Sequence, residues 1–151
     1  MLINRNFSKG FTLIELMIVV VLISVIVLIA MPNYQQYVRR AEASQVQQEM
    51  QNIAMELEKS KNRNFNYLGF EKGNTANQIS FGKYVITVRD GSNTSLDLTH
   101  DKALGQSWVI LAQTTDAKNF NFLFTSSGLK CKTYASSTIN YSDCGNDSEA
   151  W

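Results

Sequence analysis

The hydrophobic and polar positions divide the chain into three regions with different patterns. The first is an almost unbroken hydrophobic run over residues 11–31, in which Glu15 is the one charged residue. As a helix that rises about 1.5 Å per residue, the run is long enough to cross a hydrocarbon core of roughly 30 Å. It is longer than the apolar core of a cleaved secretory signal. The pattern therefore predicts a membrane-spanning helix that remains in the mature protein.

The second region begins after Pro32 and has a helical rather than a uniform hydrophobic pattern. Residues 33–62 contain no glycine or proline and are rich in helix-favouring Gln, Glu and Ala. A proline inside a helix kinks it, so we expect one continuous, kinked helix rather than two separate ones. Hydrophobic residues recur mostly every three or four positions, which predicts an amphipathic helix that another layer must cover. They are Tyr34, Val38, Ala41, Val46, Met50, Ile53, Ala54 and Leu57.

The third region has the pattern of a β-sheet. Residues 63–78 are rich in Asn and Gly and predict a connecting loop. Four strands are then expected, at 84–88, 95–99, 108–114 and 120–125, because hydrophobic positions alternate or run together between turn residues. Connections this short favour antiparallel pairing. The chain is thus predicted to have an α+β fold, with a long N-terminal helix packed on a four-stranded antiparallel sheet within residues 79–125.

Composition narrows the range of functions. The 151 residues include 14 basic and 13 acidic ones, a net charge of +1, which argues against a surface that binds polyanions over its whole extent. There is no phosphate-binding loop, H-E-x-x-H or G-x-S-x-G motif, and His100 is the only histidine. The spacing of Asp143, Asp147 and Glu149 lacks the pattern of a calcium loop. We expect no enzymatic activity, no cofactor and no bound metal.

Two cysteines, Cys131 and Cys144, lie near the C-terminus. A C-x-x-C redox motif is absent, which argues against catalytic thiol chemistry. Two alternatives remain, a disulfide or two free thiols. A disulfide closing this loop would contribute about 3 kcal/mol in the chain-entropy model, and it would require an oxidising compartment.

The position of Glu15 does not suit a plain membrane anchor, which the hydrophobic run alone would indicate. An acidic side chain at the centre of a membrane helix costs roughly 2.5–3.5 kcal/mol. Residues 9–15 read K-G-F-T-L-I-E, followed by the hydrophobic run and Pro32. This segment resembles the class III signal of type IV pilins. The resemblance implies that a prepilin peptidase removes residues 1–10 as a leader, cutting between Gly10 and Phe11, and that the new amine of Phe11 is methylated.

The resemblance also implies a layout and an assembly mechanism. Residues 11–33 would be the transmembrane and assembly helix, and residues 34–151 the globular domain. Residues 126–151 would form a C-terminal loop closed by a Cys131–Cys144 disulfide. Phe11 and Glu15 lie one turn apart on a helix. Glu15 would pair with the N-terminal amine of a neighbouring subunit. Pro32 would also belong to the residues of this helix that serve assembly.

The function implied is that of a structural subunit of a type IV pilus, supporting twitching motility, adhesion or DNA uptake. The segments N-Y-Q-Q-Y-V-R-R and D-C-G-N-D-S-E-A-W resemble those of type IVa minor pilins. Implied partners are other pilin subunits, the prepilin peptidase and the inner-membrane assembly platform. The subunit would lie in the inner membrane, with its globular domain in the periplasm, and then in the extracellular pilus.

Two alternatives stay open. One is a pseudopilin of a type II secretion system. The other is a DNA-binding competence pilin, which needs an exposed basic patch. Lys118, Lys130 and Lys132 are close in sequence, but nearby acidic residues dilute their charge.

Overall fold

The computed structural model describes residues 10–73, 77–134 and 139–151. Within these ranges there is one helix, α1 (Leu13–Asn64), followed by six strands. The strands are β1 (Gln78–Phe81), β2 (Tyr84–Asp90), β3 (Trp108–Thr114), β4 (Phe120–Thr125), β5 (Lys130–Tyr134) and β6 (Glu149–Ala150). The chain forms two units, one up to Val38 and one from Arg39 onward, and α1 contributes to both. Residues 1–9 of the expected leader lie outside the described residues.

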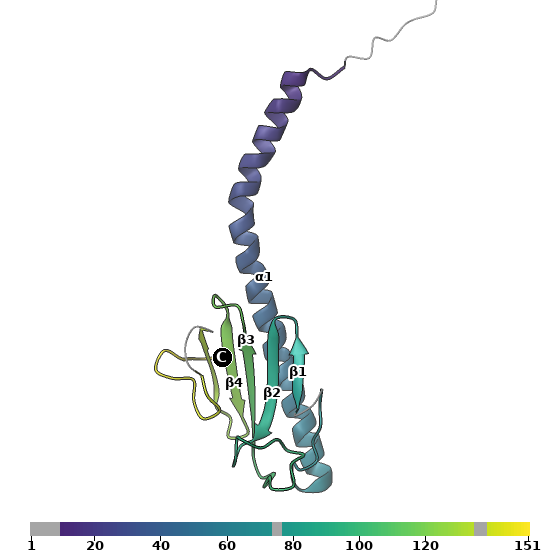
Figure 1. The fold of residues 1–151 in the computed structure, drawn as a ribbon, viewed down its shortest axis with the longest axis vertical. Coiled ribbons are helices and arrows are strands. Elements are labelled where there is room, and N and C mark those ends of the chain that lie inside the picture. Colours follow the sequence, from purple (N-terminus) through teal and green to yellow (C-terminus); the bar gives the residue numbers. More distant parts are fainter. Residues whose placement is uncertain (1–9, 74–76, 135–138) are drawn as a thin grey trace, which may run out of the picture. The chain divides into compact units, whose positions relative to one another are not determined.

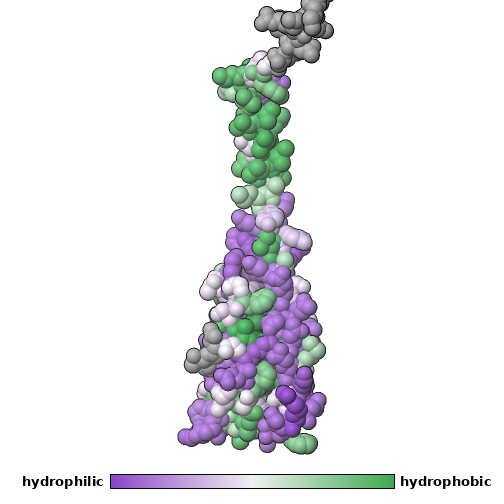
Figure 2. All heavy atoms as spheres, turned by 90° about the vertical axis from the view of Figure 1, so that its right-hand side faces the viewer, coloured by the Kyte–Doolittle hydropathy of each residue, from purple (hydrophilic) through white to green (hydrophobic). Residues whose placement is uncertain are grey.

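The N-terminal unit is the hydrophobic part of α1. Thr12 precedes the helix, and its hydroxyl accepts a hydrogen bond from the backbone N–H of Glu15 (3.3 Å), as an N-cap does. The helix continues through Pro32, which confirms that one helix rather than two spans this region. The segment is long and hydrophobic enough to cross a membrane, and Figure 2 shows its largely hydrophobic surface. The kink expected at Pro32 stays a prediction.

In the second unit, the part of α1 from Arg39 onward packs on one face of the sheet (Figure 1). The strand order is β1-β2-β3-β4-β5-β6 and every neighbouring pair is antiparallel, so each strand pairs with the next one along the chain. The predicted hydrophobic stripe of the helix is confirmed, because Val46, Met50, Ile53 and Leu57 are all fully buried. They join residues of β2, β3 and β4 in one core, which confirms the α+β, pilin-like fold.

A second, smaller core lies on the other face of the sheet. Strand β3 is hydrophobic on both faces and is buried over Trp108 to Ala112. Val109 and Leu111 pack with Leu123 of β4 and with Cys131 and Cys144. The C-terminal loop therefore covers the face of the sheet that the helix leaves open.

The prediction of a strand at residues 95–99 is wrong. These residues belong to the loop between β2 and β3, where the side chains of Asn93 and Asp97 accept hydrogen bonds from the backbone N–H groups of Ser95 and Thr99. Such side-chain bonds stabilise turns in place of a strand ladder. Leu98, which produced the alternating pattern, is instead fully buried in the helix-side core.

The sheet has six strands where four were expected, and it extends beyond residues 79–125 at both ends. Strand β1 starts at Gln78, at the end of the expected loop, and α1 ends at Asn64 rather than near residue 62. Strands β5 and β6 lie in the segment expected to be only a loop, 126–151, of which residues 135–138 are outside the described ranges. The mostly polar sequence of β5, K-C-K-T-Y, has no hydrophobic alternation that would have revealed it.

Candidate functional site

The residues of the predicted assembly site lie at the start of the N-terminal unit. Gly10 and Phe11 precede α1, Glu15 is in its first turn, and Pro32 lies inside it. All four are exposed, and a methyl group added to Gly10 would meet nothing within 4 Å. Steric contacts within the chain therefore do not require a glycine at position 10. Processing at Gly10–Phe11, methylation of Phe11 and pairing of Glu15 stay predictions.

The disulfide between Cys131 and Cys144 is present, with its Cα atoms 6.1 Å apart. Cys131 lies in β5, and both cysteines are buried in the smaller core. Beyond Cys144 the chain returns to pair β6 with β5, placing Ala150 opposite Cys131. This return brings the indole of Trp151 onto the sheet, where its Nε1 donates to the backbone carbonyl of Cys131 (3.0 Å).

On one side of the sheet, aromatic side chains of β4 lie opposite lysine and tyrosine side chains of β5. In the antiparallel register Phe120 faces Tyr134 and Phe124 faces Lys130, and directly opposed residues project to the same side of a sheet. With Lys132 and Trp151 they form a surface that we call the cation–aromatic face. Its members are Phe120, Phe124, Lys130, Lys132, Tyr134 and Trp151.

The two lysines of the cation–aromatic face lie over aromatic rings. The Lys130 ammonium is 4.5 Å from the ring centre of Phe124 and 5.3 Å from that of Trp151, and the Lys132 ammonium is 5.0 Å from that of Phe120. The negative face of each ring attracts the cation and orients it. Lys132 also pairs with Glu149 (3.3 Å), whereas Lys130 has no acidic side chain at ion-pair distance among the described residues.

The third lysine of the predicted cluster is placed apart from the other two. Lys118 lies in the turn between β3 and β4, where its backbone N–H donates to the Asp116 carboxylate (3.0 Å). That hydrogen bond, with the charges of Arg39 and Lys83, lowers the pKa of Asp116. The turn is thus an ion-pair cluster, and the structure brings only Lys130 and Lys132 together.

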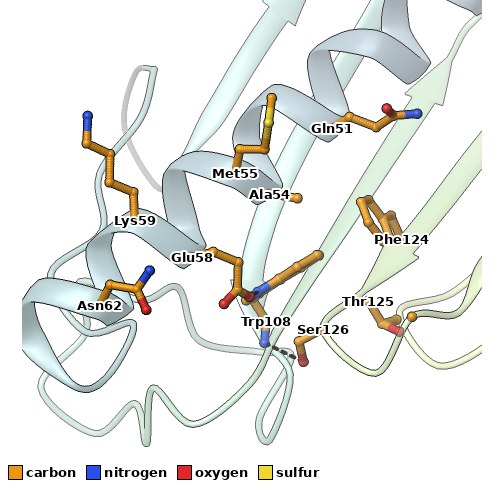
Figure 3. A pocket seen from close by; sticks show the side chains of 11 residues that line it. Gln51, Ala54, Met55, Glu58, Lys59, Asn62, Trp108, Phe124, Thr125 and Ser126 are labelled. Carbon is orange, nitrogen blue, oxygen red and sulfur yellow. Dashed lines mark hydrogen bonds between the residues drawn. The ribbon is translucent and has the colours of Figure 1, made fainter.

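A groove of about 590 Å³ lies between α1 and the strands β3 and β4 (Figure 3). Residues of the helix, including Gln51, Met55 and Glu58, line one side of it. Trp108, Phe124 and Ser126 are among those on the other side. Phe124 also belongs to the cation–aromatic face, so the groove and that face are continuous. Sequence reasoning missed the groove, because its two sides are far apart along the chain.

Glu58 is held in a fixed orientation at the groove. Its Oε1 accepts hydrogen bonds from the Tyr67 hydroxyl (2.7 Å) and the Trp108 indole N–H (3.3 Å). Tyr67 and Trp108 are both almost completely buried. Burial raises the pKa of the Tyr67 hydroxyl, and the hydrogen bond to Glu58 raises it further. Among the residues that the structure describes, no group of three His, Cys, Asp or Glu side chains is arranged to hold a metal ion.

Comparison with known proteins matched the N-terminal part of the chain to pilins. Residues 5–31 match the prokaryotic N-terminal methylation motif. The type IV major fimbrial protein FimA of Dichelobacter nodosus is 51% identical over 45 residues, 30% of this chain and 29% of FimA. The fimbrial protein of Moraxella nonliquefaciens is 55% identical over 40 residues, 26% of each chain. The type IV major pilin protein PilE1 of Neisseria gonorrhoeae is 51% identical over 41 residues, 27% of this chain and 25% of PilE1. The matched stretch spans less than a third of these relatives.

The globular part has its own match. Residues 32–134 match the family described as type IV minor pilin ComP, DNA uptake sequence receptor. No solved structure matches the chain. Pilins are structural rather than enzymatic proteins, in agreement with the expectation that the chain is not an enzyme. Since the second match covers more than half of the chain, the protein belongs to the type IV minor pilins of the ComP family and carries the N-terminal methylation motif of type IV pilins.

Proposed function

We propose that the chain is a minor subunit of a type IV pilus that binds DNA through its globular unit during DNA uptake. The observation that carries this proposal is the match to the ComP family over residues 32–134, whose description names a DNA uptake sequence receptor. The sequence alone favoured a structural role in motility, adhesion or DNA uptake, with a secretion pseudopilin and a DNA-binding competence pilin as the two alternatives. The family match favours the DNA-binding alternative, and it offers no support for a secretion pseudopilin.

The cation–aromatic face has the chemistry that DNA binding requires. Lysines supply the phosphate contacts that dominate affinity for DNA, and aromatic rings beside them can contact sugars or stack on bases. Several other basic residues have acidic partners: Arg39 with Asp116, Lys72 with Glu49 and Glu56, and Lys83 with Glu42 and Asp116. On the cation–aromatic face, Lys132 pairs with Glu149, whose side chain is 71% exposed, and Lys130 forms no ion pair among the described residues. Binding would therefore be local, as expected for a chain with a net charge of only +1.

The N-terminal unit would serve membrane insertion and assembly. We infer that cleavage after Gly10 exposes the amine of Phe11 and that Glu15 pairs with this amine in a neighbouring subunit. The hydrophobic side chains of residues 11–31 are exposed in the isolated chain. They would contact lipid before assembly and the helices of other pilins in the filament afterwards.

The test of DNA binding uses the full chain in detergent micelles and a fluorescent duplex between 50 and 200 mM salt. Binding should weaken as salt rises. A double substitution, Lys130→Gln with Lys132→Gln, should reduce the slope of log affinity against log salt by about 2, because each lysine lost removes about one phosphate contact. Anisotropy measures the affinity.

The control is Lys102→Gln, which removes one positive charge from an exposed position in the loop between β2 and β3. This variant should bind like the unmodified protein. Equal slopes for the double variant and the control would exclude the cation–aromatic face as the DNA site. An absence of duplex binding at 50 mM salt would contradict the proposed function itself.

A further inference from the structure

The side chain of Glu58 lines the groove between α1 and β4, and only one of its two carboxylate oxygens accepts hydrogen bonds from the residues that the structure describes. Glu58 Oε1 accepts two hydrogen bonds from buried groups, the Tyr67 hydroxyl and the Trp108 indole. Within the described part of the chain, no hydrogen-bond donor contacts Glu58 Oε2. Figure 3 shows the carboxylate of Glu58 beside the side chain of Trp108. Because the two bonds to Oε1 fix the carboxylate, Oε2 is a positioned acceptor for a donor group of a ligand.

The remaining lining of the groove suits a flat, partly polar ring. Met55 and Phe124 supply hydrophobic contacts, while Gln51 and Asn62 supply amide groups. The volume of about 590 Å³ lies within the usual range for small-molecule sites. Groups of both kinds at one concave site are what a nucleobase requires, since its faces are hydrophobic and its edges polar.

Basic residues stand on both sides of this groove. Lys59 lines it from the helix, and Lys130 lies over Phe124, whose ring lines it from the sheet. The two lysines would attract phosphate groups that lie outside the groove. The carboxylate of Glu58 would accept a hydrogen bond from a donor group of the ligand inside the groove. This is the charge distribution of a nucleotide within a DNA strand.

We propose that the groove binds one unpaired base of bound DNA and that Glu58 selects guanine. This inference rests on the proposed DNA-binding function. The Watson–Crick edge of guanine presents two adjacent donors, N1–H and the N2 amino group, and both can donate to the one free oxygen of Glu58, Oε2. Adenine and cytosine place a ring-nitrogen acceptor beside their amino group, and thymine flanks its single N–H with two carbonyl oxygens. Each of these acceptors would face the negative charge of Glu58.

The base must be unpaired, because in a duplex its partner base covers the same edge. Extruding a base from a duplex costs a few kcal/mol, whereas a single strand offers it without that cost. The inference therefore predicts guanine selectivity for single strands. The duplex affinity assigned to the cation–aromatic face is a separate property.

The experiment compares labelled single strands of thymine with strands of the same length that carry one central guanine. The full chain in detergent micelles is titrated and anisotropy measured at constant salt. A single guanine should strengthen binding about tenfold, within the range of a good base contact. Glu58→Gln should abolish this preference, because Tyr67 and Trp108 still require an acceptor and so turn the amide N–H₂ toward the ligand.

Glu56→Gln is the matched control. It removes the same charge two residues away on α1, outside the groove, where Glu56 pairs with Lys72. This variant should keep the guanine preference, and its loss there would show a general charge effect and overturn the inference. If the unmodified chain binds duplex DNA but does not distinguish the two strands, the inference is wrong and the proposed function stands. If it binds neither strands nor duplex, the proposed function fails as well.

Discussion

A single buried carboxylate, that of Asp90, organises the loop between β2 and β3. Its two oxygens accept hydrogen bonds from the backbone N–H groups of Ser92 (2.9 Å), Leu104 (2.6 Å) and Gly105 (3.3 Å). Asp90 is fully buried at the end of β2. It therefore joins the beginning of the loop to its end.

Replacing Asp90 with Asn should lower the free energy of unfolding by about 1–3 kcal/mol, because the amide cannot accept at both positions and leaves a buried N–H unsatisfied. Thermal unfolding of the full chain in micelles measures the change. Asp101→Asn is the control in the same loop, since the Asp101 side chain is 82% exposed, and it should change stability by less than about 0.5 kcal/mol. Equal effects of the two substitutions would contradict the role of Asp90.

At the scale of secondary-structure elements, the β3–β4 turn ties the sheet to the helix. Asp116 of this turn forms ion pairs with Arg39 of α1 (3.4 Å) and with Lys83 of the β1–β2 turn (3.9 Å). Asn119 also donates a hydrogen bond to the backbone carbonyl of Arg39 (3.3 Å). The turn thus connects three segments that are distant along the chain.

The lowered pKa of Asp116 predicts how stability depends on pH. The backbone hydrogen bond from Lys118 is the largest cause, and the charges of Arg39 and Lys83 add to it. A lowered folded-state pKa stabilises the protein above the unfolded value, about 3.9, and this contribution disappears as pH falls through the folded value. Urea unfolding at pH 6 and pH 3 should therefore show a smaller loss of stability for Asp116→Asn than for the unmodified chain. An identical loss would contradict the linkage.

The strands show where sequence patterns inform and where they fail. Alternating or unbroken hydrophobic residues correctly predicted β2, β3 and β4. The same kind of alternation at residues 95–99 misled, because turn-forming hydrogen bonds from Asn93 and Asp97 override it. Strand β5 escaped prediction because its mostly polar sequence, K-C-K-T-Y, has no hydrophobic alternation, although it pairs with β4 and β6.

At the scale of the whole molecule, the two units differ in how far their hydrophobic residues are exposed. The globular unit buries its hydrophobic residues in two cores, whereas the N-terminal unit exposes a row of them. An exposed hydrophobic segment of this length needs lipid or other pilin helices around it. Glu15 is costly in both surroundings unless a cation pairs with it.

Glu15→Ala subunits should be processed normally but be absent from filaments, because the proposed pairing with the Phe11 amine of a neighbour would be lost. Mass spectrometry of the membrane fraction and of sheared filaments would report both the N-terminus and the incorporation. Ser24→Ala is the matched control on the same helix, where the hydroxyl only donates to the carbonyl of Val20 (2.7 Å). Incorporation of Glu15→Ala at the control level would exclude the pairing.

The amino-acid sequence by itself determined the helix, its hydrophobic and amphipathic parts, three of the strands and the pilin-like N-terminal segment. These features depend on local periodicity or on a short contiguous motif, so neighbouring residues suffice to specify them. Only the tertiary structure decided that Lys130, Phe124 and Trp151 meet on one face and that Glu58 accepts a hydrogen bond from the indole N–H of Trp108. Trp151 and Lys130 are 21 positions apart, and Trp108 and Glu58 are 50 apart. These contacts exist because strand register, the disulfide and helix packing bring separate segments together.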